Sequence, residues 1–265
     1  MSFSAFQPIP FFPAFAALLG LVLGSFCNVC IWRHISGESI VYPPSHCPEC
    51  GHRLRAWELV PLLSWMALRG RCASCRQPIS LRYPLVETLT ALIAALLAWR
   101  FGPSPAFAAL LALSCAFITA SGIDALTFIL PDRYTLGTAL PALLCSVFLL
   151  GLPWGESLAG GLIGAGSFWL VQALFKRLRG VDGLGFGDVK LMLPLGFLTG
   201  PWLLPLTVLA AGLSALAFAL PAALLRGSEL RGLRVPFGPF LCLGAFVSLM
   251  WGESLLLWWL CFLQG

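Results

Sequence analysis

The segment GLGFGDVK, residues 183–190, contains a carboxylate at the entrance to a long apolar run. Asp188 directly follows Gly187, a second glycine lies at Gly185, and Lys190 comes shortly after. An ionisable side chain beside hydrocarbon is costly and usually has a partner or a function. Glycine makes a backbone easy to bend and open to close approach by another chain. We therefore interpret Gly185, Gly187 and Lys190 as support for a catalytic Asp188.

Two further acids lie in GIDALTFILPD, residues 122–132, where Asp124 and Asp132 flank another apolar stretch. Two carboxylates at close range share a proton, so one can activate a water while the other protonates a carbonyl. This is the chemistry of aspartic proteases. Alternatively, the acids of this segment only cap helix ends or neutralise Arg133 and Lys190. We predict that Asp124 and Asp188 form the catalytic pair and that Asp132 has a positioning role.

The composition of the chain predicts a membrane protein. Of its 265 residues, 59% are hydrophobic and only 10% are charged, whereas soluble domains carry about 25% charged residues. The mean hydropathy is +0.90. The N-terminal stretch has no basic region, and the apolar run of residues 11–32 is too long for the core of a signal peptide, which favours a retained first span.

The predicted fold is an all-α polytopic membrane protein with about eight transmembrane helices and a small cytoplasmic zinc-binding insert. We divide the chain into a first span at residues 1–32, the insert at 33–82 and a transmembrane peptidase core at 83–265. The predicted spans lie near 10–32, 83–101, 105–123, 134–151, 157–175, 189–200, 203–225 and 236–262. The glycines of GGLIGAG, 160–166, have the small-residue spacing that lets membrane helices pack closely.

The basic residues predict the orientation of these spans. With residues 33–82 in the cytoplasm, fifteen of the 16 basic residues fall on that side and only Arg100 falls outside. This count requires two crossings between Lys190 and Arg226, with a turn at Thr199-Gly200-Pro201 and a short or broken sixth helix. Both termini are then outside, and Asp124 and Asp188 reach the same cytoplasmic depth. The net charge of +5 indicates contact with anionic lipid headgroups and no nucleic acid.

Four cysteines of the polar insert form two C-x-x-C pairs, Cys47 with Cys50 and Cys72 with Cys75. This spacing is typical of a tetrahedral zinc site, and a metal would help so small a polar insert to fold. Two disulfides are the alternative, which the reducing cytoplasm disfavours. His46 and His52 flank the first pair, and we interpret them as ordinary polar neighbours.

Several motifs together resemble the bacterial type IV prepilin peptidase family, and the resemblance covers nearly the whole chain. GIDALTFILPD resembles the catalytic Asp and Leu-Pro-Asp pattern, and GFGDVK resembles the Gly-x-Gly-Asp motif of these intramembrane aspartic proteases. Further similar segments are GSFCNVCIWR (24–33), PPSHCPEC, RCASC, ISLRYPLVETLT (79–90) and VPFGPFL (235–241). The departures are cysteines at 27 and 30 and Leu59-Val60-Pro61, where the family commonly has Asn-Ile-Pro.

The resemblance implies a function. The expected substrates are type IV prepilins or type II secretion pseudopilins, cut after a glycine on the cytoplasmic side of the inner membrane by Asp124 and Asp188. The family also implies N-methylation of the new N-terminus with S-adenosylmethionine, whose binding residues the sequence does not identify. We consider two alternatives: a secondary transporter with a carboxylate cation site, and a peptidase without methylation, as in archaeal preflagellin peptidases. The insert, and the absence of a clear repeat between the two halves, count against the transporter.

Overall fold

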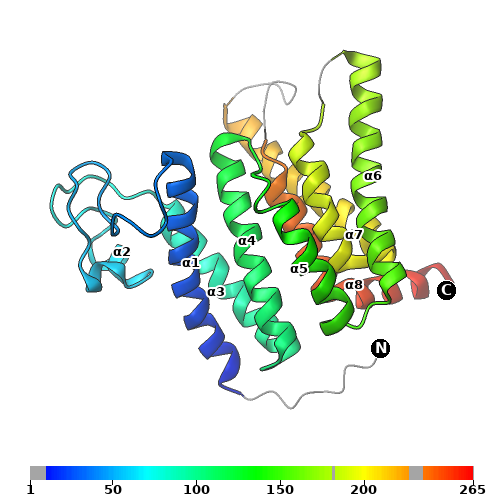
Figure 1. The fold of residues 1–265 in the computed structure, drawn as a ribbon, viewed down its shortest axis with the longest axis horizontal. Coiled ribbons are helices and arrows are strands. Elements are labelled where there is room, and N and C mark those ends of the chain that lie inside the picture. The colour runs from blue at the N-terminus through cyan, green and yellow to red at the C-terminus, as the bar shows by residue number, and fades with distance from the viewer. Residues whose placement is uncertain (1–9, 181–182, 227–234, 265) are drawn as a thin grey trace. The chain divides into compact units, whose positions relative to one another are not determined.

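A computed structural model describes residues 10–180, 183–226 and 235–264 of the chain. These residues are mainly helical and contain no strand, only two isolated β-bridges in the insert (Figure 1). The long helices are α1 (Phe12–Ser36), α3 (Arg82–Phe101), α4 (Pro105–Thr127), α6 (Trp154–Arg179), α7 (Phe186–Arg226) and α8 (Gly238–Gln264). The short ones are η1 (Ala56–Leu59), α2 (Leu63–Ala67), η2 (Leu136–Thr138), α5 (Ala139–Leu144) and η3 (Cys145–Leu149).

The prediction of a multi-pass membrane protein is confirmed. Within the described ranges, six helices are long and apolar enough to cross a membrane, and a shorter apolar helix runs from Leu136 to Leu149. The longest of the six, α7, contains Gly200 at φ 67° and ψ 174°, where the helix is broken. Counting α7 as two helices and adding the short one brings the total close to the predicted eight.

The break in α7 lies within the predicted Thr199-Gly200-Pro201 turn. A positive φ with an extended ψ is essentially restricted to glycine, so Gly200 rather than the nearby prolines makes the break. In Figure 1 the first and the last residues of α7, yellow and orange, both lie at the top of the view, so the helix reverses direction at its break. The piece from Phe186 to Thr199 is about 20 Å long at 1.5 Å per residue, shorter than the ~30 Å hydrocarbon core.

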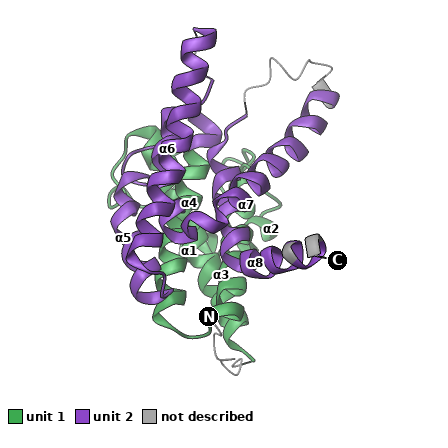
Figure 2. Cartoon of the chain, turned by 90° about the vertical axis from the view of Figure 1, so that its right-hand side faces the viewer, with its two compact units in different colours: residues 1–123 green, residues 124–265 purple. Residues whose placement is uncertain are grey.

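The chain forms two compact units, Met1–Ile123 and Asp124–Gly265 (Figure 2). The first unit contains the insert together with α1, α3 and most of α4. The division into residues 1–32, 33–82 and 83–265 stays a prediction. In the first unit α1 packs along α3 at Gly20 and Gly24. A Cβ at Gly20 would lie 2.6 Å from the Cα of Ala91, and one at Gly24 would lie 2.7 Å from the Cα of Glu87.

The second unit is built on α7, which packs against both α6 and α8. A Cβ at Gly160 would lie 2.3 Å from the carbonyl oxygen of Gly196, and one at Gly164 would lie 3.2 Å from that of Met192. The predicted packing role is therefore confirmed for Gly160 and Gly164, because only small residues allow these backbones to approach so closely. An added Cβ at Gly166 would meet nothing within 4 Å. This packing lies against the first piece of α7, which has Asp188 near its start.

Candidate active site

Asp124 lies in the last turn of α4 and is 5% exposed. Its Oδ2 atom accepts a hydrogen bond from the backbone N–H of Gly238 at 3.1 Å. Gly238 is the first residue of α8, and the first N–H groups of a helix have no partner within the helix. The positive end of the helix dipole also favours a negative charge at this position. The start of α8 therefore supplies Asp124 with a donor.

Asp188 lies in the first turn of α7 and is 7% exposed. Its backbone N–H donates to the carbonyl oxygen of Gly185 at 3.1 Å. Its carboxylate is close enough to that of Asp124 for the two to interact electrostatically. Two buried acids from distant parts of the sequence therefore belong to one unit and to one electrostatic environment, as the predicted pair requires.

The glycines of the Gly-x-Gly-Asp segment provide space rather than a special backbone conformation. Neither Gly185 nor Gly187 has a positive φ. A Cβ at Gly187 would lie 2.9 Å from the Cβ of Leu130, and a Cβ at Gly185 would lie 3.2 Å from Oδ2 of Asp188. A side chain at Gly187 would thus displace Leu130, and one at Gly185 would press on the Asp188 carboxylate.

Leu130 is a residue that sequence reasoning missed. It is 9% exposed, and besides Gly187 it touches Gly238, where an added Cβ would lie 3.2 Å from its Cδ2 atom. Its side chain therefore contacts the start of α7 and the start of α8. Gly238 was missed too, although its position before Pro239 at the start of the last apolar segment is a signal that could have found it.

Asp132 and Lys190 form an ion pair beside this site. Lys190 Nζ lies 2.6 Å from Asp132 Oδ1 and 5.2 Å from the centre of the Phe186 ring. The Asp132 side chain is 61% exposed, in contrast to the two buried acids. Exposed pairs contribute about 0.2–1 kcal/mol. The pair joins the Leu-Pro-Asp segment to α7, which agrees with a positioning role.

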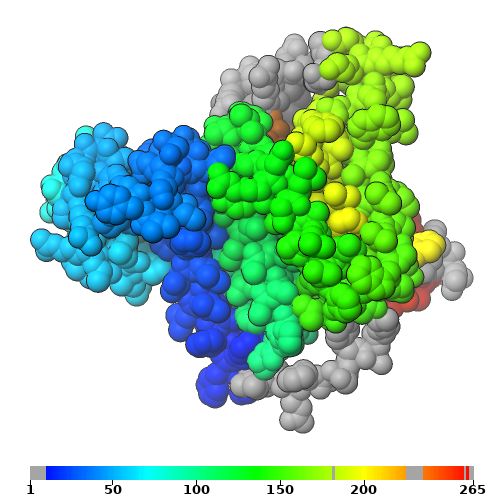
Figure 3. Space-filling view, in the orientation of Figure 1, coloured from blue at the N-terminus to red at the C-terminus, as the bar shows by residue number. Residues whose placement is uncertain are grey.

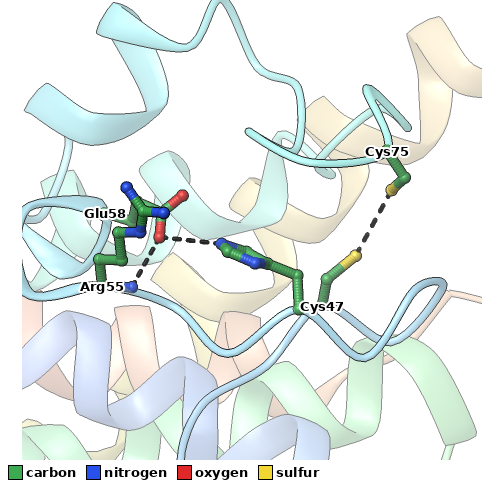
Figure 4. Close-up of polar contacts among 5 residues, drawn as sticks. Cys47, Arg55, Glu58 and Cys75 are labelled. Atoms are coloured by element: carbon green, nitrogen blue, oxygen red, sulfur yellow. Dashed lines mark hydrogen bonds and ion pairs between the residues drawn. The ribbon is translucent and has the colours of Figure 1, made fainter.

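The four cysteines of the insert form one cluster in the first unit. The Sγ atoms of Cys47, Cys50, Cys72 and Cys75 all lie within 4.8 Å of one another, and those of Cys47 and Cys75 are 3.9 Å apart (Figure 4). A tetrahedral zinc with Zn–S bonds of about 2.3 Å places its sulfurs about 3.8 Å apart. The residues therefore fit a four-cysteine zinc site.

The two C-x-x-C segments fold as matching turns. The N–H of Cys47 donates to the carbonyl of His52 and that of Cys72 to the carbonyl of Gln77, both at 2.9 Å. The backbone N–H groups of Cys75 and Ser74 lower the pKa of Cys72 to about 6. This favours the thiolate, which is the form that binds a metal.

The two histidines beside the first pair lie outside the cysteine cluster. His52 Nε2 is 3.2 Å from Glu58 Oε2, and His46 Nδ1 is 3.1 Å from the carbonyl oxygen of Pro44. The Glu58 carboxylate therefore lies between the His52 ring and the backbone of Arg55, whose N–H donates to Glu58 Oε2 at 2.6 Å (Figure 4). Sequence reasoning did not find this role of Glu58 in bracing the first turn.

Two family models match the chain. The bacterial peptidase A24 N-terminal domain matches residues 18–101, and the type IV leader peptidase family matches residues 110–220. The first range contains the four cysteines, and the second contains Asp124 and Asp188. No solved structure matches the chain.

Curated relatives match over nearly the full length. Proteins named prepilin leader peptidase/N-methyltransferase are 36% identical in Pseudomonas putida (96% of this chain, 95% of the relative) and 37% in Pseudomonas aeruginosa (90% of each). The relative of that name in Burkholderia pseudomallei is 39% identical over 90% of this chain and 85% of its own length. These matches confirm the resemblance drawn from the motifs and give no support to the transporter alternative. The chain belongs to the type IV leader peptidase family.

Proposed function

We propose that this protein is a prepilin leader peptidase and N-methyltransferase with Asp124 and Asp188 as its catalytic acids. It removes the basic leader of type IV prepilins or type II secretion pseudopilins after a glycine, and it methylates the new N-terminus. The observation that carries the peptidase assignment is the pair of buried, interacting carboxylates at the ends of α4 and α7. The names of the relatives support both activities.

In cleavage, a water attacks the scissile carbonyl carbon and gives its proton to one carboxylate, while the other acid protonates the carbonyl oxygen. The tetrahedral intermediate then collapses: its hydroxyl returns a proton to the acid, the C–N bond breaks, and the leaving nitrogen takes the proton that the base had accepted from the water. The hydrogen bond that the backbone N–H of Gly238 donates to Asp124 stabilises a negative charge on this carboxylate. We therefore assign Asp124 as the base that activates the water and Asp188 as the acid.

Methylation requires S-adenosylmethionine, whose sulfonium supplies an electrophilic methyl group to the free amine of the mature substrate. The four cysteines would hold a zinc with a structural role, because four thiolates leave no open coordination position for chemistry. We place the protein in the inner membrane with its catalytic acids at the cytoplasmic face. The distribution of the basic residues supports this placement, and a four-thiolate metal site is compatible with the reducing conditions of the cytoplasm.

The test is prepilin cleavage by Asp124→Asn, Asp188→Asn and the double variant, each purified and shown to be inserted. Each single variant should lose orders of magnitude in rate because an amide cannot exchange the protons. The double variant should cleave only a little more slowly than either single variant, since the two groups act as one unit. Glu253→Gln, at an exposed acid within α8, is the matched control and should cleave normally. Near-normal cleavage by either aspartate variant would remove the assignment.

A further inference from the structure

The first unit contains an open cavity that the peptidase mechanism does not use. It lies between the second half of α1, the first turns of α3 and the insert, and its walls include Asn28, Trp32, Glu58, Trp65 and Glu87. Figure 3 shows the insert as the cyan body beside the blue α1. Cys47 and Cys72 also line this cavity, so the cysteine cluster shapes one of its walls.

The cavity contains buried acceptors that lack a hydrogen-bond donor among the described residues. Asn28 is 1% exposed, and its Nδ2 atom donates to the carbonyl oxygens of Gly24 and Tyr83 at 3.3 and 3.1 Å. These two bonds fix the orientation of the amide, and Oδ1 is left without a partner. Oε2 of Glu38, another lining residue, is also unpartnered. A buried acceptor left unpaired costs about 1–3 kcal/mol, so a ligand that brings N–H or O–H donors would be stabilised here.

The lining is acidic. The lining residues include four glutamates, Glu38, Glu49, Glu58 and Glu87, and one arginine, Arg33. The guanidinium of Arg33 donates to the carbonyl oxygens of Ser39 and Pro43, which uses part of its hydrogen-bonding capacity. Glu87 is 6% exposed, and its Oε2 accepts the backbone N–H of Leu62 at 2.7 Å. Because buried carboxylates require a compensating positive charge, the cavity favours a cationic ligand.

Aromatic rings complete the walls. Trp32, Trp65 and Tyr83 line the cavity, and the indole N–H of Trp65 donates to the carbonyl oxygen of Ile79 at 3.3 Å. This bond holds the ring in one position. Aromatic faces attract cations and stack on flat heterocycles. The ligand that fits is therefore a cation with a flat ring and several hydrogen-bond donors.

We propose that this cavity binds the methyl donor, S-adenosylmethionine, an inference that rests on the methyltransferase part of the proposed function. The donor carries a sulfonium and an ammonium group for the glutamates and a carboxylate for Arg33. It also carries a purine for the aromatic walls, and amino and hydroxyl donors for Asn28 and Glu38. In the reaction, the neutral substrate amine forms a bond to the methyl carbon, the carbon–sulfur bond breaks with its electrons going to sulfur, and the methylated amine releases a proton to water. The insert then has a definite task, since its metal holds one wall of the donor site.

The experiment measures binding rather than turnover. Full-length protein in lipid nanodiscs is titrated with S-adenosylmethionine in a calorimeter, and zinc content is measured for every variant to show that the insert is folded. Glu87→Gln keeps the acceptor for the N–H of Leu62 but removes the charge, so the Kd of the donor should rise about tenfold or more. Glu38→Gln and Asn28→Ala should also weaken binding. Glu156→Gln, at an exposed acid in the first turn of α6, is the control and should leave the Kd unchanged.

A second measurement locates the donor directly. Ultraviolet cross-linking of radiolabelled S-adenosylmethionine should label peptides that contain Trp32 or Trp65 and none from residues 124–265. The cavity assignment fails if wild-type protein binds the donor while all three variants, with zinc retained, bind it equally well. It also fails if the label maps to the second unit, or if a mature-pilin N-terminal peptide occupies the cavity in place of the donor. If wild-type protein does not bind the donor at all, the methyltransferase proposal fails with it, whereas the peptidase assignment is tested separately by cleavage.

Discussion

Gly238 is the residue whose substitution tests the geometry of the acid pair most directly. In Gly238→Ala the new Cβ would lie 2.9 Å from Oδ2 of Asp124, and 3.2 and 3.3 Å from the two methyl carbons of Leu130. Ordinary contacts of a Cβ begin at 3.4 Å, so the carboxylate oxygen must retreat by about half an ångström. The hydrogen bond from the Gly238 N–H is 3.1 Å long, and such a retreat stretches it beyond a useful length.

The expected loss follows from that bond. A hydrogen bond to a charged group contributes about 1.5–3 kcal/mol, and each 1.36 kcal/mol corresponds to a factor of about ten in rate. Gly238→Ala should therefore cut prepilin cleavage by roughly 10- to 100-fold. Insertion and thermal stability should change little, because alanine is a better helix former than glycine. Gly166→Ala on α6 is the matched control, since nothing lies within 4 Å of its added Cβ.

The assay is single-turnover cleavage of a prepilin by each variant at equal amounts of inserted enzyme. A second variant, Gly238→Ala combined with Leu130→Ala, separates the two contacts. If pressure on Leu130 caused the loss, the double variant would recover. If displacement of Asp124 causes it, as the shorter 2.9 Å contact indicates, activity stays low. Cleavage by Gly238→Ala within about threefold of the wild-type rate would refute the assignment of this N–H to Asp124.

Three further predictions concern the supports of the two sites. Cys72→Ser should lower bound zinc from about one per chain to near zero and open the insert to limited proteolysis; a full zinc complement measured by mass spectrometry would contradict the cluster. Asp132→Asn should lower cleavage only severalfold and Lys190→Met to a similar degree, because each breaks the same exposed ion pair; a loss as large as that of a catalytic-acid variant would place Asp132 in the reaction. The backbone N–H of Arg55, followed by the hydrogen bond and charge of His52, lowers the pKa of Glu58 in the folded insert. Its stabilising contribution is therefore present above the ordinary carboxyl pKa and is lost as the pH falls through the lowered value. Glu58→Gln should accordingly make the insert exchange amide hydrogens faster at neutral pH, with the difference from wild type closing in acid; a difference independent of pH would show that the charge is not involved.

Some features of this protein follow from local sequence. The spans follow from runs of apolar residues, because a helix must satisfy its own backbone in hydrocarbon whatever surrounds it. The break at Gly200 was predictable, since the basic residues on either side require a reversal within a short segment. The cysteine cluster was predictable as well, because each C-x-x-C pair closes a local turn and a tetrahedral metal joins the two.

The acid pair was only partly predictable. The sequence places Asp124 and Asp188 at ends of apolar segments, and the orientation of the spans predicts that both reach the same side. The contacts that surround them depend on the packing of distant helices. The hydrogen bond from Gly238 to Asp124 joins residues 114 positions apart, and no local pattern predicts which helix start will meet which carboxylate.

The tertiary structure also changed the interpretation of single residues. Gly187 was expected to loosen the backbone, but it lies in the first turn of α7 and leaves room for Leu130. In the sequence, Asn28 is only a polar residue within an apolar helix. The structure shows that its Oδ1 atom has no partner and that the residue lines a cavity formed with the insert. The sequence by itself determined the helices, the turn at Gly200 and the candidate ligands, because these depend on neighbours along the chain. Only the tertiary structure decided which side chains meet, because burial, unpaired acceptors and close glycine contacts arise when segments far apart in sequence pack together.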